Sequence, residues 1–160
     1  MDSAFMGATE NGRYSVCGGT TKVIDTDGSP PITSFSGQEY VNRIEEYSED
    51  WSYLKFSRLK DGRFYRVGPL ARLNIVDSMG TPAADAALEE YRKKFGRHVQ
   101  TTLAYNQARY IEFLASCERA VEILSNPSIT STDVRTPVDC VINNRGGVGI
   151  IEAPAWHAHS

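Results

Sequence analysis

The longest hydrophobic pattern in this sequence runs from about residue 99 to residue 124 and has the spacing of an α-helix. Its apolar positions are Val99, Leu103, Tyr110, Ile111, Leu114, Cys117, Val121 and Leu124, and Asn126–Pro127 ends the pattern. A helix of about 25 residues would be roughly 40 Å long, which exceeds the diameter of a compact domain of this size. We therefore expect exposed apolar surface, self-association or a place in a larger assembly.

A second helix is predicted by its end signals. Thr81 supplies a hydroxyl cap, and Pro82 occupies the first helical position, where its missing amide costs nothing. The segment 83–95 continues the helix and Gly96 ends it.

Short β-prone runs account for most of the remaining order. Residues 14–17 and 21–24 flank a glycine pair and predict a hairpin, and residues 51–56 and 64–67 flank Asp61–Gly62 and predict another. A short helix is expected over residues 36–47 and a final strand over 148–153. The predicted class is α+β, with small antiparallel hairpins or a small sheet and a dominant long helix. We expect a loose terminus over residues 1–12, one domain over 13–154 and a divergent tail over 155–160.

Composition excludes several classes of protein. The 17 Lys and Arg residues against 20 Asp and Glu give a net charge of −3, which argues against a strongly basic nucleic-acid binder. Apolar runs are too short for a membrane-spanning helix, and the first dozen residues lack the pattern of a secretory signal. Three cysteines, an odd number, favour a reducing compartment, so we expect a cytoplasmic, soluble protein.

Metal ligation has little support in the sequence. Cys17, Cys117 and Cys140 form no Cys-x-x-Cys spacing, and each is most simply interpreted as a small buried hydrophobic residue. His157 and His159 are weak candidate ligands, because two imidazoles two residues apart share one face of a strand. A solvated terminus is the simpler explanation of both histidines.

Other catalytic patterns are absent from the sequence. It contains no Gly-x-Ser-x-Gly elbow, and its two glycine-rich stretches lack the spacing of phosphate-binding loops. Glu152 follows an apolar strand-like run and precedes Ala153–Pro154, where a strand delivers a carboxylate to the end of a sheet. A structural edge position is the alternative for this residue.

Four segments resemble, in order, the large subunit of nickel-iron hydrogenases, and most closely its cytoplasmic group linked to nicotinamide or deazaflavin cofactors. They are Trp51–Phe56, Tyr65–Asn74, Thr101–Tyr105 with Ala108–Arg109, and Gly147–Pro154. The most specific is Tyr65–Asn74, with the sequence Tyr-Arg-Val-Gly-Pro-Leu-Ala-Arg-Leu-Asn. The resemblance implies a central part of a larger, helical-bundle large-subunit fold, reversible oxidation of H2, and Glu152 and Pro154 near the active site.

The sequence also departs from that family. Both Cys-x-x-Cys motifs that hold nickel and iron are missing, and Ala155–Trp156 replaces the family's Arg-Gly. We therefore expect no cofactor in this chain and no catalytic competence for it alone; the alternative is a non-catalytic scaffold or partner-binding module derived from the family. The implied partners are the hydrogenase small subunit, the remaining large-subunit segments or a second copy, and no nucleic acid.

Overall fold

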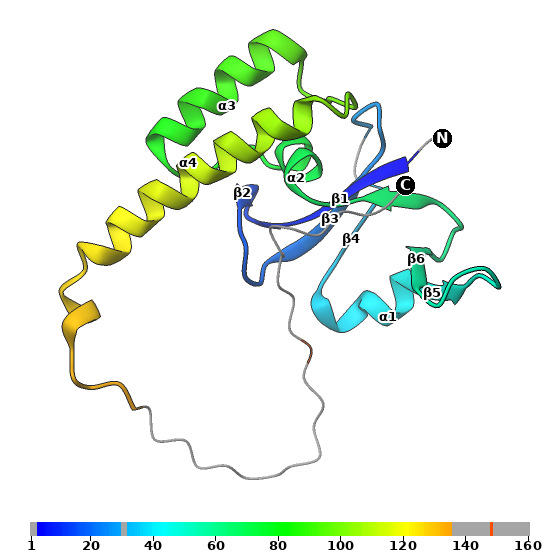
Figure 1. Ribbon diagram of the computed structural model, residues 1–160, viewed down its shortest axis with the longest axis horizontal. Coiled ribbons are helices and arrows are strands. Elements are labelled where there is room, and N and C mark those ends of the chain that lie inside the picture. The colour runs from blue at the N-terminus through cyan, green and yellow to red at the C-terminus, as the bar shows by residue number, and fades with distance from the viewer. Residues whose placement is uncertain (1–2, 30–31, 136–147, 149–160) are drawn as a thin grey trace.

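Strand β1 (Ser3–Glu10) is the centre of a five-stranded sheet in the computed structural model, which describes residues 3–29, 32–135 and 148. It pairs antiparallel with β2 (Arg13–Tyr14) and β3 (Thr20–Ile24), and parallel with β7 (Phe64–Arg66). Strand β4 (Thr33–Phe35) adds to the free edge of β3 (Figure 1). The loose terminus expected over residues 1–12 is therefore wrong for β1.

The two faces of this sheet bury different cores. Phe5 and its register partner Ile24 pack with Ala71 and Ile75, which lie on a helix behind the sheet. The opposite face carries a cluster of Ala4, Val23, Phe35 and Leu59. Because alternate residues of a strand point to opposite faces, β1 is covered on both sides.

A separate two-stranded hairpin lies below the main sheet in Figure 1. Strands β5 (Ile44–Ser48) and β6 (Lys55–Leu59) pair antiparallel, with Ile44 opposite Leu59 and Ser48 opposite Lys55. The 3-10 turn η1 (Gly37–Glu39) and helix α1 (Tyr40–Arg43) precede it. The helix predicted over residues 36–47 thus ends at Arg43. Neither of the two predicted hairpins forms as expected, because β3 and β7 each pair with β1.

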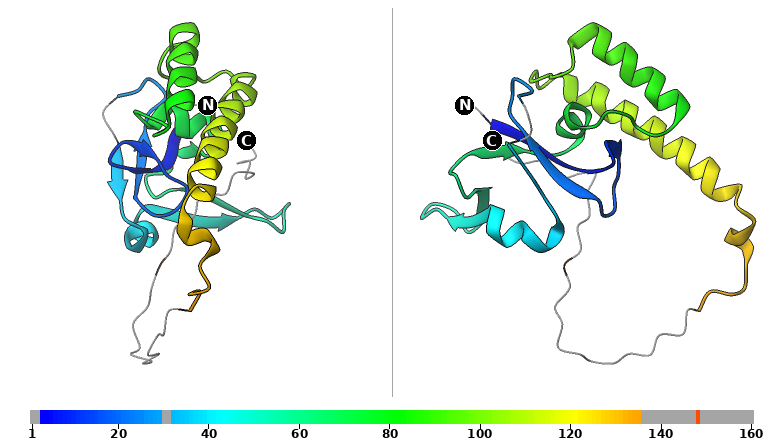
Figure 2. Two further views of the ribbon diagram at one scale, coloured as in Figure 1. Left: turned by 90° about the vertical axis from the view of Figure 1, so that its left-hand side faces the viewer. Right: turned by 180° about the vertical axis from the view of Figure 1, so that it is seen from behind.

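Three helices form a layer against the sheet. Helix α2 (Pro69–Ile75) lies between the sheet and α4 (Ala104–Leu124), and α3 (Pro82–Phe95) packs beside α4 (Figures 1 and 2). The 3-10 turn η2 (Pro127–Thr130) follows α4. Helix α3 begins and ends where its signals predict, with Gly96 at φ 86°. The α+β class is confirmed, whereas a larger helical-bundle fold is not supported by the described residues.

Helix α4 is shorter than predicted and faces the core with a different side. It has 21 residues, and Val99 lies in the preceding loop. Its buried positions are Ala104, Ala108, Ile111, Glu112 and Ala115. Most of the predicted apolar stripe points to solvent, including Leu103 at 80% and Leu124 at 71% exposure. Small alanine side chains allow the close packing against α2 and α3, so the large side chains occupy the outer face.

Candidate functional site

The residues singled out from the sequence as site candidates lie outside the described part of the chain. Glu152, Pro154, His157 and His159 all belong to segments whose structure is not described, as does Cys140. The predictions for them therefore stay predictions. Cys17 and Cys117 are described, and both are exposed, so the prediction that they are buried is wrong. Cys117 lies on the side of α4 opposite the buried alanines.

The described residues do not fit a metal centre. Residues 3–29, 32–135 and 148 contain no group of three or more His, Cys, Asp or Glu side chains that could hold a metal ion. Cys17 lies in the loop between β2 and β3, and Cys117 lies on α4. We therefore assign no step of metal chemistry to these residues.

The Tyr65–Asn74 segment builds a buried polar centre. It leaves β7, turns at Gly68 with φ 91°, and enters α2, all seven residues of which are buried. Pro69 begins the helix, where its fixed φ suits the first position. Gly68 is favoured at the turn because side chains rarely adopt a positive φ. Two residues of this buried helix, Arg72 and Asn74, are polar.

Arg72 forms a buried, two-pronged ion pair with Glu112 on α4. Its Nε lies 2.6 Å from Glu112 Oε1, and its Nη2 lies 2.8 Å from Oε2. The side chains are only 1% and 9% exposed. A planar guanidinium fits a carboxylate in this manner, so the pair fixes the orientation of α4 across α2.

Asn74 and Tyr105 connect the same centre to two loops. The Asn74 amide donates to the Val99 carbonyl at 2.9 Å and accepts the Val99 amide at 3.0 Å. The Tyr105 hydroxyl donates to the carbonyl of Val67. Burial raises the pKa of Tyr105. The polar centre therefore holds α2, α4 and the loop before α4 together.

The sequence reasoning missed this centre, although a signal for it was present. Arg72 is flanked by Leu70, Ala71 and Leu73, so a helix through this segment buries a guanidinium among apolar side chains. A buried cation needs an anionic partner. That partner could not be chosen from sequence, because Glu112 lies 40 residues away.

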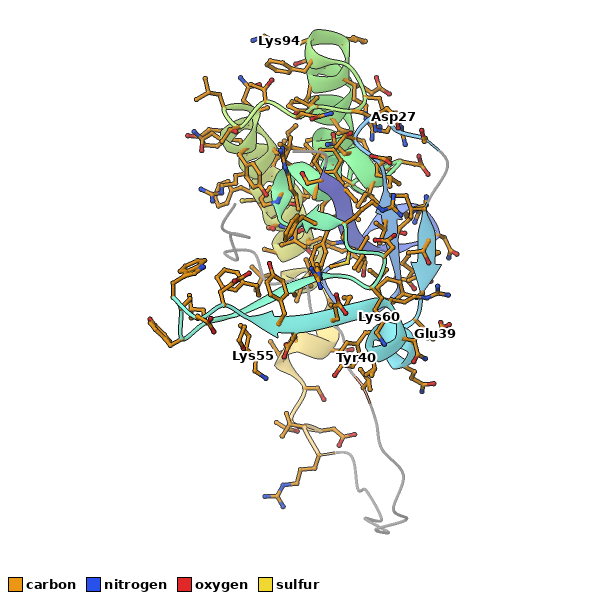
Figure 3. All side chains as sticks on the ribbon, turned by 90° about the vertical axis from the view of Figure 1, so that its right-hand side faces the viewer. Asp27, Glu39, Tyr40, Lys55, Lys60 and Lys94 are labelled. Atoms are coloured by element: carbon orange, nitrogen blue, oxygen red, sulfur yellow. The ribbon has the colours of Figure 1, made fainter. Side chains whose placement is uncertain are left out.

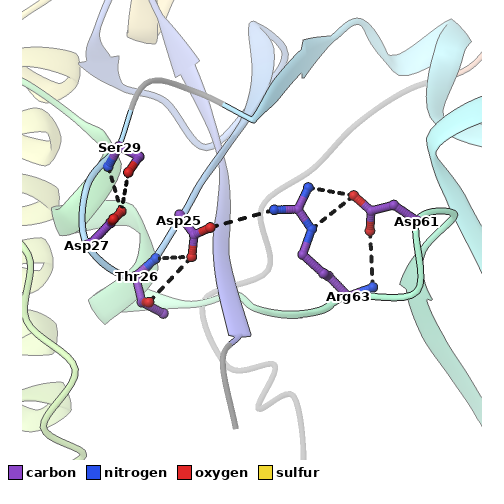
Figure 4. Close-up of polar contacts among 6 residues, drawn as sticks. All are labelled: Asp25, Thr26, Asp27, Ser29, Asp61 and Arg63. Atoms are coloured by element: carbon purple, nitrogen blue, oxygen red, sulfur yellow. Dashed lines mark hydrogen bonds and ion pairs between the residues drawn. The ribbon is translucent and has the colours of Figure 1, made fainter.

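A half-exposed ionic network joins the loop after β3 to the turn before β7 (Figure 4). Arg63 lies 2.5 Å from Asp61 and 3.6 Å from Asp25. The Arg63 side chain lowers the pKa of Asp61 chiefly by hydrogen bonding. In the loop after β3, a hydrogen bond from the Ser29 hydroxyl lowers the pKa of Asp27. Every carboxylate of the network has a partner within the chain, so the network ties two loops together.

Two exposed apolar surfaces stand out among the described residues. The first, which we name the α4 outer face, consists of Leu103, Tyr110, Phe113, Cys117, Val121 and Leu124, all exposed. Figure 1 shows the second half of α4 extending away from the sheet. The second surface, the hairpin tip, is the segment 49–54 between β5 and β6, where Trp51 is 77% and Tyr53 96% exposed. Contiguous apolar surfaces of this kind mark sites of association.

The part of the chain that the structure describes contains no helix long and apolar enough to cross a membrane.

Comparison with known proteins points to hydrogenases. No family model matches the chain. The chain is 40% identical over 158 residues to the A-type subunit of the vhu F420-non-reducing hydrogenase of Methanococcus voltae, a match that covers 96% of this chain and 37% of that protein. It is 38% identical over 163 residues to an iron-sulfur subunit of the F420-non-reducing hydrogenase of Archaeoglobus profundus, covering 94% of this chain and 33% of that protein.

Two further similarities extend this result. NAD-reducing hydrogenase HoxS subunit beta of Cupriavidus necator is 38% identical over 142 residues, covering 85% of this chain and 29% of that protein. A chain of the crystal structure of NAD+-reducing [NiFe]-hydrogenase in the H2-reduced state superimposes with a TM-score of 0.80 at 29% identity, covering 96% of this chain and 35% of that chain. The chain thus spans about a third of the length of the relatives it matches.

These findings correct the narrower identification made from the sequence. The names of the relatives describe an A-type subunit, an iron-sulfur subunit and a beta subunit. The identification as a central fragment of a nickel-iron large subunit is replaced accordingly. The function inferred from it is withdrawn, as is the alternative of a non-catalytic scaffold or partner-binding module. What the comparisons support is similarity, over about a third of their length, to hydrogenase subunits of the vhu A-type and HoxS beta kind.

Proposed function

We propose that this chain works as part of a hydrogenase subunit of the vhu A-type kind, within an enzyme that interconverts H2 with two protons and two electrons. The observation that carries the proposal is the 40% identity to the Methanococcus voltae vhu protein, which runs through 96% of the chain. A TM-score of 0.80 to a hydrogenase chain supports the same conclusion from the fold.

The role we propose for the described residues is structural positioning within that enzyme. The sheet, α2 and α4 form one framework, fixed by the buried Arg72–Glu112 pair. The α4 outer face then meets another part of the enzyme, since Tyr110 is 73% and Val121 65% exposed in the isolated chain. We place this assembly in the cytoplasm, because three cysteines without a disulfide pattern suit a reducing compartment.

A segment exchange tests the proposal. The matched segment of the Methanococcus voltae vhu protein is replaced by this chain in the natural host, with an affinity tag on the exchanged subunit. We expect the tagged subunit to retain the other hydrogenase subunits on purification and to support H2-dependent dye reduction. The unmodified subunit is the positive control, and a subunit with the segment deleted is the negative control. An exchanged subunit that accumulates normally but retains neither partners nor activity would overturn the proposal.

Thiol labelling tests the α4 outer face within the same experiment. Cys117 lies on that face and Cys17 lies elsewhere, and both are exposed in the free chain. We expect a maleimide reagent to modify both thiols in the free chain. In the assembled enzyme, labelling of Cys117 should fall, as read by mass spectrometry of its peptide. Equal labelling of Cys117 in the free and assembled states would place the contact elsewhere.

A further inference from the structure

The hairpin tip displays large side chains that nothing within the described chain covers. Trp51 is 77%, Tyr53 96% and Leu54 51% exposed. Tryptophan and tyrosine are the residues most enriched among those that dominate binding energy at protein interfaces. Two of them within three residues, at the end of an arm, form a compact anchor.

The tip is ordered before any partner binds. The Ser52 amide donates to the Glu49 carbonyl at 3.0 Å, and the Leu54 amide donates to the Ser52 hydroxyl at 3.1 Å. The ring of Trp51 lies 5.4 Å from that of Phe56, measured between centroids. Binding therefore needs little further ordering of the loop, which lowers the entropic cost of association.

The arm that carries the tip is stiffened by cross-strand contacts. Phe56 also contacts Tyr47, with ring centroids 5.7 Å apart, and the Arg58 guanidinium lies 4.9 Å above the Tyr47 ring. At its base, buried Leu59 joins the core of the main sheet. Figure 3 shows Lys55 at the outer part of the hairpin and Lys60 at its base, where the Lys60 amide donates to the Arg43 carbonyl of α1 at 3.0 Å. The arm thus holds the tip away from the sheet.

The charge around the tip indicates what kind of surface it fits. Glu45 and Glu46 are paired with Arg58 and Lys55, at 2.5 and 3.4 Å. The carboxylates of Glu49 and Asp50, directly before Trp51, form no ion pair within 4 Å among the described residues, and Glu49 acts on Arg58 only through its longer-range charge. An aromatic anchor with an acidic rim is complementary to an apolar pocket with Lys or Arg at its edge.

We propose that the hairpin tip docks into such a pocket on another subunit of the same hydrogenase. Trp51 and Tyr53 fill the apolar pocket, and Glu49 and Asp50 pair with its basic rim. This inference rests on the proposed function, because the partner belongs to the enzyme in which the chain works.

The exchanged, tagged vhu subunit supplies the test, with the other Methanococcus voltae subunits as the probe. Trp51→Ala with Tyr53→Ala should reduce their retention during purification by about tenfold or more, as expected for loss of interface anchors. Glu49→Lys with Asp50→Lys should also reduce retention, and should weaken its dependence on salt. Tyr40→Ala is the control, because it removes an exposed aromatic ring (45%) from α1 and leaves the tip intact, and Tyr53→Ala alone is its size-matched counterpart at the tip.

Hydrogen exchange distinguishes the possible occupants of the tip. We expect amides of residues 49–54 to exchange more slowly in the assembled enzyme than in the isolated exchanged subunit. Equal exchange in the two states, or unchanged retention in the Trp51 and Tyr53 variant, would overturn the inference. Concentration-dependent dimerisation of the chain that this variant abolishes would assign the tip to a second copy, and would also overturn it. If the exchanged subunit without tip substitutions already fails to assemble, the proposed function falls, and this inference falls with it.

Discussion

Replacing Glu112 with alanine removes the carboxylate that Arg72 binds in the interior of the protein. Both oxygens of Glu112 accept a hydrogen bond from this guanidinium, at 2.6 and 2.8 Å. The Arg72 side chain is 1% exposed, so water cannot take the place of the two Glu112 oxygens. The variant must therefore keep a poorly compensated buried cation or open the contact between α2 and α4.

The expected cost follows from this burial. Breaking a buried ion pair by removing one partner destabilises proteins by about 3–5 kcal/mol. The total stability of a domain is only about 5–15 kcal/mol, so the loss would be a large fraction of it. For a chain of this length the melting temperature should fall by about 6–20 °C.

Urea unfolding followed by far-ultraviolet circular dichroism measures the effect on the chain. Arg72→Met combined with Glu112→Leu is the decisive comparison, because it removes both charges and keeps the volume apolar. We expect the free energy of unfolding of this double variant to lie within about 1 kcal/mol of the parent's value, or to exceed it. Arg72→Lys should fall between the two, since lysine keeps the charge and loses the two-pronged geometry.

The reasoning would be refuted by a small effect of the single variant. If Glu112→Ala costs less than about 1 kcal/mol, the guanidinium is not held in an environment that penalises an uncompensated charge. A double variant as unstable as the single one would show that shape, not charge, sets the cost.

Three further predictions concern the loops around the helices. Gly28→Ala should lower the free energy of unfolding in urea by more than about 1 kcal/mol, because φ is +77° and the added Cβ would lie 2.2 Å from the His98 ring. Gly62→Ala is the control for backbone strain alone, because φ is +89° there and no atom lies within 4 Å of the added Cβ. Burial, reinforced by neighbouring arginines, lowers the pKa of His98, so protonation opposes folding. Stability should fall as the pH drops below about 6.5, and His98→Gln should reduce this slope in melting temperatures measured across the range. Arg92→Met should cost about 1–3 kcal/mol in urea unfolding, because Arg92 donates to carbonyls at the end of α2, including that of Val76 at 2.6 Å; a loss below about 0.5 kcal/mol would contradict this.

Helix α3 was predictable because its signals are local. Thr81, Pro82 and Gly96 act on the residues beside them, and the helix runs from Pro82 to Phe95. Such signals need no knowledge of what lies nearby in space.

Strand β1 was not predictable in this way. Ser3, Ala4, Gly7 and Ala8 are small, and all are buried because β1 is covered on both faces. A central strand of this kind shows no alternation of apolar and polar residues. Its role depends on partners at residues 20–24 and 64–66, which no local pattern specifies.

The orientation of α4 illustrates a second limit of periodicity. The helix carries two apolar stripes, one of alanines with Ile111 and one of larger side chains including Tyr110 and Val121. Weighting by side-chain size selects the larger stripe as the core, whereas close packing selects the alanines. Glu152 and the other site residues predicted from the sequence lie outside the described residues, so the predictions for them stay predictions.

The central position of β1 also constrains the order in which the chain folds during synthesis. Ser3 pairs with Phe64, so this edge of β1 waits for a segment translated about 60 residues later. Helix α2 follows directly, and its Ala71 and Ile75 cover Phe5. We expect the nascent chain to compact in one late step, after α2 emerges, because closing so long a loop must precede the contacts that stabilise it. Until then β1 can pair with the nearby β2 and β3, whereas its edge that pairs with β7 stays open, and the nascent chain depends on chaperones or on speed to avoid mispairing at that edge.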